Sequence, residues 1–433
     1  MKTKLSLAVA SALLAAASSA NAGIMIPAGD WTLDIGGIVN TYYTSTRATG
    51  TAHGAGYGGA LFTSNDAGKT TSNITTGLLP NYLSVSGKTR QNDLDVGFTI
   101  SIQPGSSTKS AGIQSFNNGA GARQENRQAF LTFGDKSWGS IKLGKDLGIY
   151  ASDAILNDMT LLGVGSGAGG LAGNTTTTGR IGTGFMYADW KAQVAYSSPN
   201  WNGFSFTGGV TQAWNAIAVG SVGGSSTSTE RGGSSPAFEG KASYEWAGDF
   251  GGKVWVSGIT QKVRGLTNGT GFTQDATTGL VTAGAANTLT DTSDTADAWD
   301  IGGTVNAAGF GLTGYYYQGE GIGQTVQLNH GFDASGNARD SDGWYVQGTY
   351  TIPTVGTKIG LSYGESSLDG TAADVTLNSL EDSMWTIGVY HPITKHLNLV
   401  AEYSDVESKY DRKVLGEQKA KAKTIDFGAI LFF

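Results

Sequence analysis

The 433-residue chain contains no cysteine and only 7 prolines, and charged residues make up only 15% of it. Without cysteine, no disulfide framework can hold the fold together. Beyond residue 22, no window approaches the ~18 consecutive apolar residues that a transmembrane helix needs, so the sequence excludes a helical membrane protein. A typical soluble domain carries about 25% charged residues. The polarity here comes instead from Thr, Ser, Asn and 67 glycines, a mixture that favours strands and loops over helices.

The first 22 residues have the three parts of a secretory signal peptide. Lys2 and Lys4 supply a basic start, and the apolar run over residues 5–17 is too short to cross a bilayer as a helix. Ala20-Asn21-Ala22 is a small-residue site that predicts cleavage after Ala22 rather than an uncleaved anchor. Loss of the two lysines moves the formal net charge from −7 to about −9. This acidic balance argues against nucleic-acid binding.

Beyond Gly29 the dominant pattern has a period of two residues, as in strands with one apolar face. The end of the chain shows it clearly. The apolar residues there are Ile425, Phe427, Ala429, Leu431 and Phe433, which alternate with a set that begins with Thr, Asp and Gly. Chain ends are usually frayed and polar. The apolar face of this last segment must therefore be covered, either by protein or by lipid.

Sixteen alternating segments are separated by seven short turns and eight long loops. The turns are rich in Gly, Pro, Asn and Asp, as tight turns require. We expect strands at residues 30–46, 79–90, 93–104, 127–135, 139–148, 184–198, 203–214, 236–247, 252–263, 298–307, 309–321, 341–352, 357–368, 383–392, 396–409 and 422–433. An even number of strands, with short turns at one end and long loops at the other, is typical of outer-membrane barrels.

The lengths of the segments fit such a barrel. About ten to twelve residues at ~3.4 Å each, tilted by ~40°, span about 25–30 Å, which matches an apolar band ~25 Å tall. An open sheet edge in lipid would leave backbone groups unpaired, so the last strand must pair with the first. Sixteen strands leave an aqueous lumen. The sequence therefore predicts an all-β, transmembrane antiparallel β-barrel of 16 strands with short periplasmic turns and long extracellular loops; a soluble β-sandwich or β-helix is the alternative.

Three stretches resemble the trimeric general porins of the Gram-negative outer membrane. The most specific is Val194 to Phe206, which is similar to the family's pattern V-x-Y-x-S-P-x-aromatic-x-G-F. Residues 127–131 and 139–145 resemble the family's fourth and fifth strands. The terminal Phe433, with Leu431 and Phe427 before it, resembles the signal that the outer-membrane assembly machinery reads. The resemblance implies a homotrimer in outer-membrane lipid and lipopolysaccharide, a water-filled channel for passive diffusion of small hydrophilic solutes and ions, no enzymatic activity and no cofactor.

The same resemblance implies a domain organisation and a pore constriction. A signal peptide, residues 1–22, precedes a single barrel domain, residues 23–433, whose third long loop, residues 149–181, folds inward. Residues 151–159 of this loop are compatible with a short helix. In such a constriction, carboxylates on the loop face cations on the opposite wall, and the resulting field orients dipolar solutes and sets ion preference.

The residues that match these roles form two groups. By resemblance the acidic side is Asp158, with Asp153 nearby, and the basic side is Arg127 and Arg180, with Lys145 as a weaker candidate. The chain departs from the family where Leu162 replaces a second loop acid and where Tyr82 replaces an arginine. Lys88 shares a strand face with Tyr82 and should also point inward. Strict alternation places Arg127 on an apolar face, so either the folded loop covers that face or its orientation is reversed.

Three further hypotheses remain open. Aspartates at positions 291, 294, 297 and 300 could hold a divalent cation that bridges lipopolysaccharide, or could form a solvated acidic loop. Tyr315 and Tyr317 could line a channel specific for a sugar or an organic acid, or could belong to an aromatic belt at the membrane surface. A surface-adhesion barrel is a third class of function. The four histidines, at positions 53, 330, 391 and 396, lie in no recognisable catalytic motif. The acidic excess suggests a mild cation preference.

Overall fold

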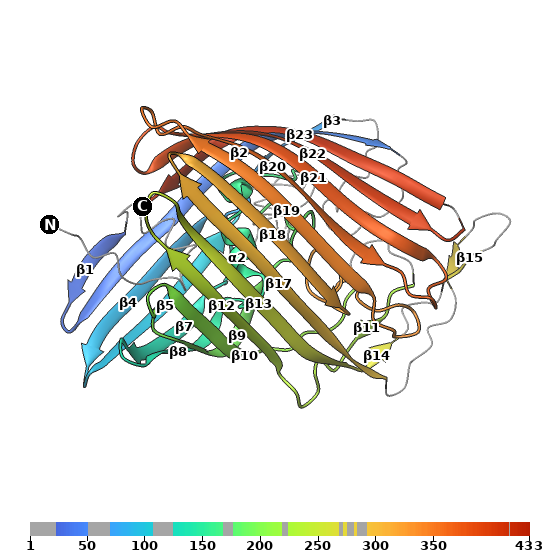
Figure 1. Ribbon diagram of the computed structural model, residues 1–433, viewed down its shortest axis with the longest axis horizontal. Helices are drawn as coiled ribbons and strands as arrows, with labels where there is room; N and C mark the ends of the chain where they lie inside the picture. Colours follow the sequence, from blue (N-terminus) through green and yellow to red (C-terminus); the bar gives the residue numbers. More distant parts are fainter. Residues whose placement is uncertain are drawn as a thin grey trace, which may run out of the picture.

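The computed structural model describes residues 23–50, 70–106, 124–167, 176–218, 224–267, 272–274, 281–283, 292–414 and 416–433. The predicted signal peptide, residues 1–22, lies outside this part of the chain. Nineteen described strands form one antiparallel sheet, and sixteen of them close into a barrel, as predicted. The strands run obliquely around the barrel wall, and helix α2 lies inside it (Figure 1).

The barrel strands follow one another in chain order. They are β2 (Trp31–Gly50), β4 (Tyr82–Gln91), β5 (Leu94–Pro104), β7 (Ala129–Asp135), β8 (Gly139–Leu147), β9 (Trp190–Ser197), β10 (Phe204–Thr211), β12 (Ala237–Trp246), β13 (Gly251–Arg264), β17 (Ser293–Ala307), β18 (Phe310–Glu320), β19 (Asp340–Thr351), β20 (Lys358–Asp369), β21 (Leu377–Pro392), β22 (Leu397–Arg412) and β23 (Gly416–Phe432). Each pairs with the next one, so every connection joins neighbours.

The remaining elements are short. They are β1 (Ile24–Ala28), β3 (Thr70–Thr75), β6 (Gln124–Glu125), β11 (Thr227–Ser228), β14 (Leu266–Thr267), β15 (Phe272–Gln274), β16 (Val281–Ala283), α2 (Ser152–Leu156) and the 3-10 helix η2 (Met159–Leu162). β1 forms a hairpin with β2 that the sequence pattern did not predict. None of the helices in the described ranges is long and apolar enough to span a membrane.

The last strand closes the barrel against the first. Strand β23 pairs with β2 from Ile38 opposite Phe432 to Gly50 opposite Ala420. Beyond the end of β23, Gly37 N–H donates to the carbonyl of Phe433 at 2.7 Å, and Phe433 N–H donates to the carbonyl of Gly37 at 3.0 Å. The final residue is therefore a paired member of the wall, and the barrel has no open edge.

The two faces of the wall differ in the way that the period-two pattern predicts. On β23, Ile425, Phe427 and Leu431 are exposed and face outward, whereas Thr424 and Asp426 are buried and face inward. Near the short turns, outward aromatic side chains pack in pairs, such as Phe310 with Tyr350 at a ring distance of 4.5 Å. An apolar outer face with aromatic residues at its margin suits contact with lipid.

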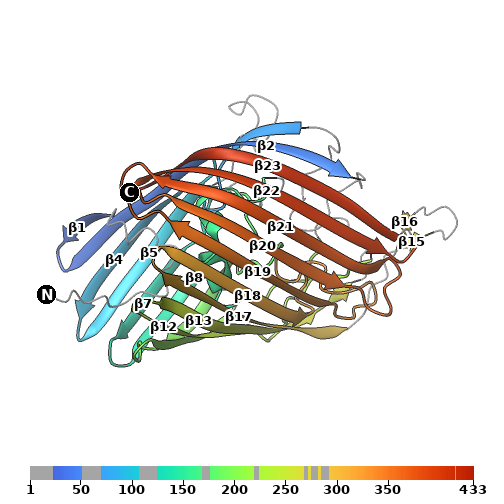
Figure 2. The ribbon, with the colours of Figure 1, turned by 45° about the horizontal axis from the view of Figure 1, so that its top comes forward.

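The strands at the C-terminal end are longer than the sequence pattern predicted. Residues 410–421 were expected to form a long loop, but β22 continues to Arg412 and β23 starts at Gly416. This expectation was wrong because the segment is rich in charged residues and contains a glycine, as a loop is, although Lys419 and Lys421 alternate with Ala420 and Ala422 in the period of a strand. A strand of 17 residues at ~3.4 Å each and a tilt of ~40° rises about 44 Å, well beyond an apolar band of ~25 Å. This side of the wall therefore extends past the membrane at the loop end (Figure 2).

A second long connection also folds inward, which the sequence pattern did not predict. The segment between β18 and β19, residues 321–339, is largely buried and bridges to Tyr187, Ile217 and Ser225. Its last residue, Arg339, is fully buried and binds Asp374 through two nitrogens at 2.8 and 2.7 Å. The lumen near the loop end is therefore occupied by packed chain as well as by the third loop.

Candidate pore constriction

The third loop leaves the wall after β8 and crosses the interior of the barrel. Its short helix α2 lies inside the region predicted from residues 151–159, and Asp153 is in its first turn. Ala151 precedes the helix in a left-handed conformation, with φ of 61°. Most residues from Ile149 to Ser166 are buried. The predicted inward course of this loop is confirmed.

At its first end, the loop is held by Glu239 on β12. One carboxylate oxygen of Glu239 accepts the backbone N–H groups of Ile149 at 2.8 Å and Tyr150 at 2.9 Å. The other oxygen accepts Lys191 Nζ at 2.8 Å and the hydroxyl of Thr211 at 2.8 Å. Glu239 is thus a buried charge with four donors, which is the arrangement that makes burial of a carboxylate tolerable.

Next along the loop, Asp153 forms ion pairs with two lysines of the wall. Its carboxylate lies 3.0 Å from Lys241 Nζ on β12 and 2.5 Å from Lys253 Nζ on β13. Lys253 also lies 3.5 Å from Glu245. Burial alone would raise the pKa of Asp153, but the two lysines outweigh it and hold that pKa below its ordinary value of 3.8. Asp153 is therefore ionised at neutral pH.

The middle of the loop is fixed by β19. The backbone N–H of Met159 donates to Gln347 Oε1 at 2.6 Å, and Gln347 Nε2 donates to the carbonyl of Asn157 at 2.9 Å. The hydroxyl of Tyr345 donates to the carbonyl of Ala154 at 2.9 Å. These side-chain contacts give polar backbone groups of the loop hydrogen-bond partners on the barrel wall.

Further along the chain, the loop is held by Glu402 on β22. A single carboxylate oxygen of Glu402 accepts the backbone N–H groups of Val164 and Gly165, both at 2.8 Å, and the other accepts the hydroxyl of Tyr390 at 2.5 Å. On β2, the hydroxyl of Tyr42 donates to the carbonyl of Leu162 at 2.7 Å. The loop therefore follows the inner wall from β12 through β19 to β22 and β2.

Two of the predicted charges, Asp158 and Arg180, lie close together within the loop. The nearest atoms, Arg180 Nε and an oxygen of Asp158, are 4.0 Å apart, and both side chains are fully buried. Arg180 also donates to the carbonyl of Met384 at 2.9 Å and to the hydroxyl of Ser362. Burial raises the pKa of Asp158 above 3.8, although Arg180 and Thr160 oppose this shift. These two charges were expected to face each other across the open lumen. They lie instead beside each other, packed against the barrel wall.

Two predicted cations are not brought to this cluster. Arg127 is buried beside Glu125, with Nε 2.8 Å from its carboxylate, and its guanidinium lies 5.8 Å from the ring centre of Trp190. Lys145 is exposed on the outward-facing side of β8, opposite Ala129, and donates to the carbonyl of Asn126. The placement of Lys145 in the lumen was wrong, because the alternation of β8 sends Asp146, and not Lys145, inward.

The other two predicted residues lie on β4. Tyr82 is buried on the inner face at the start of β4, with β3 between it and the loop end, and Lys88 is exposed nearer the short turn. Arg90 lies one step further, 2.9 Å from Asp95 on β5. On β4 the inner face is therefore covered at Tyr82 and exposed at Lys88, nearer the short turn.

Sequence reasoning did not single out Glu239, Lys241, Lys253 or Glu402. A signal for three of them was present, because Glu239, Lys241 and Glu402 belong to the polar, inward-facing sets of strands with clear alternation. Charged side chains at such positions are costly unless the fold gives them partners. Their partners are backbone N–H groups of the third loop for the two glutamates and the carboxylate of Asp153 for the two lysines, 88 to 238 residues away. No local pattern indicates them.

The remaining hypotheses can be compared with the geometry. Asp294, Asp297 and Asp300 lie in β17 and not in a loop; Asp297 is exposed outside and Asp300 is buried inside, so these two cannot share one ion. Tyr315 and Tyr317 are buried on the inner face under the third loop, and not in a surface belt. Asp291 and His53 lie outside the described residues. Within the described ranges, no group of three His, Cys, Asp or Glu residues is arranged to hold a metal.

Comparison with known proteins decides the family. The profile of a family described as Gram-negative porin matches residues 8–411. The chain belongs to the Gram-negative porin family. It is an outer-membrane channel for the diffusion of small hydrophilic solutes and ions, in agreement with the closed barrel and its inward loop. No curated protein sequence matches the chain.

Solved porin structures share the fold at low sequence identity. The outer membrane channel DcaP of Acinetobacter baumannii aligns with a TM-score of 0.62 and 16% identity, over 95% of this chain and 100% of that one. An anion-selective porin from Comamonas acidovorans aligns with a TM-score of 0.56 and 14% identity, over 93% and 100%. OmpT of Vibrio cholerae aligns with a TM-score of 0.55 and 15% identity, over 95% and 100%. Proteins of this family and fold are channels and not enzymes.

Proposed function

We propose that this porin is a general diffusion channel whose size limit and ion preference are set by the third loop. The observation that supports this most is the course of that loop along the inner wall, with Asp153 held against Lys241 and Lys253. Charges fixed on both the loop and the wall create a local field across the remaining lumen. The pore residues that we assign are Asp153, Asp158 and Arg180, together with these two lysines; Tyr82, Lys88 and Arg127 are secondary.

The net charge of the channel supports a mild preference for cations. The mature chain carries about nine more acidic than basic residues. An excess of acidic groups raises the local concentration of cations above that of anions at the channel.

The experiment that tests this function is conductance of the purified, refolded protein in a planar bilayer under a salt gradient. We expect discrete conductance steps and a reversal potential whose sign shows that cations permeate better than anions. Block by one sugar or organic acid at low concentration would instead favour a substrate-specific channel. Absence of steps from a folded barrel would contradict the proposal and favour an adhesion or structural role.

We further propose that the protein acts as a homotrimer after export and cleavage. An OmpT structure from Vibrio cholerae with the same fold is described as a trimer form. Cleavage after Ala22 is supported by the basic, apolar and small-residue parts of the leader. Phe433, Leu431 and Phe427 are proposed as the signal for the assembly machinery, and lipopolysaccharide as the surrounding lipid. Intact mass of the mature chain and cross-linking in membranes test the first two statements; bilayer steps in multiples of three support the trimer.

A further inference from the structure

The outward face of the barrel carries a row of glycines that are adjacent on three neighbouring strands. The strand registers place Gly208 on β10 opposite Gly240 on β12, and Gly240 opposite Gly258 on β13. The same row continues to Tyr196 on one side and Trp299 on the other. Three missing side chains between two large aromatic ones leave a notch in the outer surface.

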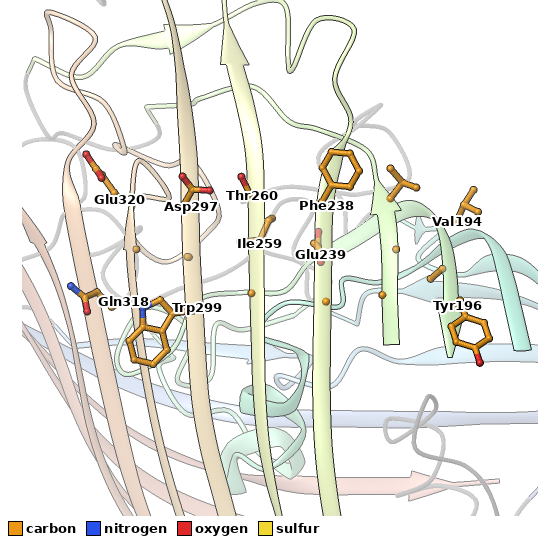
Figure 3. A pocket seen from close by; sticks show the side chains of 18 of the residues that line it. Val194, Tyr196, Phe238, Glu239, Ile259, Thr260, Asp297, Trp299, Gln318 and Glu320 are labelled. Carbon is orange, nitrogen blue, oxygen red and sulfur yellow. The ribbon is translucent and has the colours of Figure 1, made fainter. Parts of the chain in front are cut away.

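This notch is a groove of about 930 Å³. Figure 3 shows Tyr196 and Trp299 towards its two sides and Phe238 above it. Tyr196 and Trp299 are four strand spacings apart in the register, which is ~19 Å at ~4.8 Å per spacing. The floor of the groove is the backbone of these glycines, and the space above it is open. A Cβ atom added at Gly208 would meet no atom within 4 Å, and one added at Gly240 would meet only the carbonyl of Thr207, at 3.8 Å.

The walls of the groove are apolar and face the membrane. Val194, Phe238 and Trp299 are 50%, 55% and 45% exposed. A concave apolar surface in the lipid-facing band is not filled by water, and an empty groove would forfeit the dispersion contacts of its lining. Its occupant is therefore either an acyl chain or an apolar part of another protein chain.

The charges at the loop-side rim distinguish between these two occupants. Asp297, Glu320 and Asp340 are exposed and directly adjacent across β17, β18 and β19. A protein partner seated in the groove would have to desolvate these three carboxylates, which costs free energy unless each gains a cation. A lipid whose phosphate lies on cations of the neighbouring strand leaves these carboxylates hydrated and avoids that cost.

On the neighbouring strand β13, the same loop-side rim is basic. Lys262 and Arg264 are exposed on β13, two and four residues beyond Thr260, which lines the groove. Both alternate to the outward face, and both lie at the end of the strand that leads to a long loop. In an outer-membrane barrel this is the extracellular end, where lipid phosphates of the outer leaflet lie. Lys262 Nζ donates to the hydroxyl of Thr295 on β17 at 2.6 Å, so these cations border the acidic row at Asp297. A phosphate therefore finds its cations on β13, at the edge of that row.

We propose that the groove binds one acyl chain of a phosphate-bearing lipid of the outer leaflet, with the phosphate on Lys262 and Arg264. The three glycines provide the depth for the chain, and Tyr196, Phe238 and Trp299 provide its apolar walls. The two cations provide selectivity for a phosphorylated headgroup. This inference does not depend on how the third loop controls conduction.

The test is native mass spectrometry of the purified, folded protein with two probes, diphosphorylated lipid A and its dephosphorylated counterpart. Gly240→Leu fills the groove, and we expect it to reduce bound lipid A at least about tenfold, because several buried methylenes of the chain lose their site. The matched control is Gly348→Leu, an outward glycine on β19 with no atom within 4 Å of an added side chain. We expect this control to retain binding. The double variant Lys262→Glu, Arg264→Glu should weaken binding of the phosphorylated probe only.

Three results would overturn the proposal. The first is equal lipid binding by Gly240→Leu and the unmodified protein. The second is an equal loss in the Gly348→Leu control, which would indicate general annular lipid. The third is a Gly240→Leu protein that retains lipid but changes oligomeric state, which would assign the groove to a second copy of the chain. Because each variant is first checked for heat-modifiable migration, failure to fold is distinguished from loss of binding.

Discussion

Glu239 and Glu402 hold the third loop from opposite parts of the barrel wall in the same way. Each presents one carboxylate oxygen to two consecutive backbone N–H groups, those of Ile149 and Tyr150 in one case and those of Val164 and Gly165 in the other. The two glutamates differ in their other contacts. Glu239 also pairs with the buried Lys191, whereas the second carboxylate oxygen of Glu402 accepts the hydroxyl of Tyr390.

This difference predicts unequal effects of the two Glu→Gln substitutions on stability. Glu239→Gln leaves the ammonium of Lys191 buried without its counter-ion, so we expect a loss of about 3–5 kcal/mol in the free energy of unfolding. The measurement is urea-induced unfolding in lipid vesicles. The control is the double variant Glu239→Gln, Lys191→Met, which removes the unpaired charge and should recover part of the loss. A double variant no more stable than the single one would contradict this explanation.

Glu402→Gln should act mainly on the loop. A neutral amide oxygen accepts the N–H groups of Val164 and Gly165 less strongly than a carboxylate, a loss of about 1–3 kcal/mol at most. Since that end of the loop is then less firmly held, we expect a larger and noisier single-channel conductance. Glu365→Gln, on the outward face of β20, is the matched control and should leave conductance unchanged. Unaltered conductance in Glu402→Gln would show that this end does not limit the pore.

Removal of the Asp153 carboxylate and removal of its two lysine partners should shift the ion preference of the channel in opposite directions. Asp153→Asn leaves Lys241 and Lys253 with one fewer counter-charge, which should shift the reversal potential towards anions. Lys241→Met with Lys253→Met should shift it towards cations. Both shifts are measured in a planar bilayer with a tenfold salt gradient. Shifts of the same sign, or none, would show that permeating ions do not sense this cluster.

The two acids of the loop should lose their charges in a fixed order as the pH falls. The pKa of Asp158 lies above 3.8 and that of Asp153 lies below it. The charge of Asp153 therefore stabilises the fold above pH 3.8, and this contribution is lost only below that pH. The folded state disfavours the ionised form of Asp158, so ionisation of this group lowers the free energy of unfolding. As the pH falls, protonation removes this destabilisation already above pH 3.8.

The measurement for this order is the reversal potential from pH 7 to pH 3. We expect a change above pH 3.8 in the unmodified protein, and the same change in Asp153→Asn. The Asp158→Asn variant should lack it. Persistence of the change in Asp158→Asn would assign it to another carboxylate.

Removal of Phe433 should impair barrel closure. The residue exchanges two backbone hydrogen bonds with Gly37 at the seam between β23 and β2, and their loss exposes a sheet edge. We expect lower yield of folded, heat-modifiable barrel in outer membranes, and slower refolding in detergent. Phe310→Ala, which removes another exposed aromatic side chain near a short turn, is the control. A normal yield without Phe433 would contradict its role in assembly.

The sequence by itself determined the number of barrel strands, their two faces and the closure by the last strand. It could do so because side-chain direction in a strand alternates with a fixed period, and because a sheet in lipid has to close. The pattern failed for β1 and for residues 410–421, where composition and period disagreed. The sequence also predicted the inward loop, from the family resemblance, and its short helix, from helix-compatible residues within that loop.

Only the tertiary structure decided which charges meet. Asp153 contacts Lys241 and Lys253 because the loop passes β12 and β13, and Glu402 contacts Gly165 because the same loop reaches β22. Lys145 faces outward because the strand alternation places its neighbour Asp146 on the inner face. The glycine row at Gly208, Gly240 and Gly258 likewise exists only through strand register. Each of these contacts joins residues far apart in the chain, and their free energy depends on burial and distance that a periodic pattern does not contain.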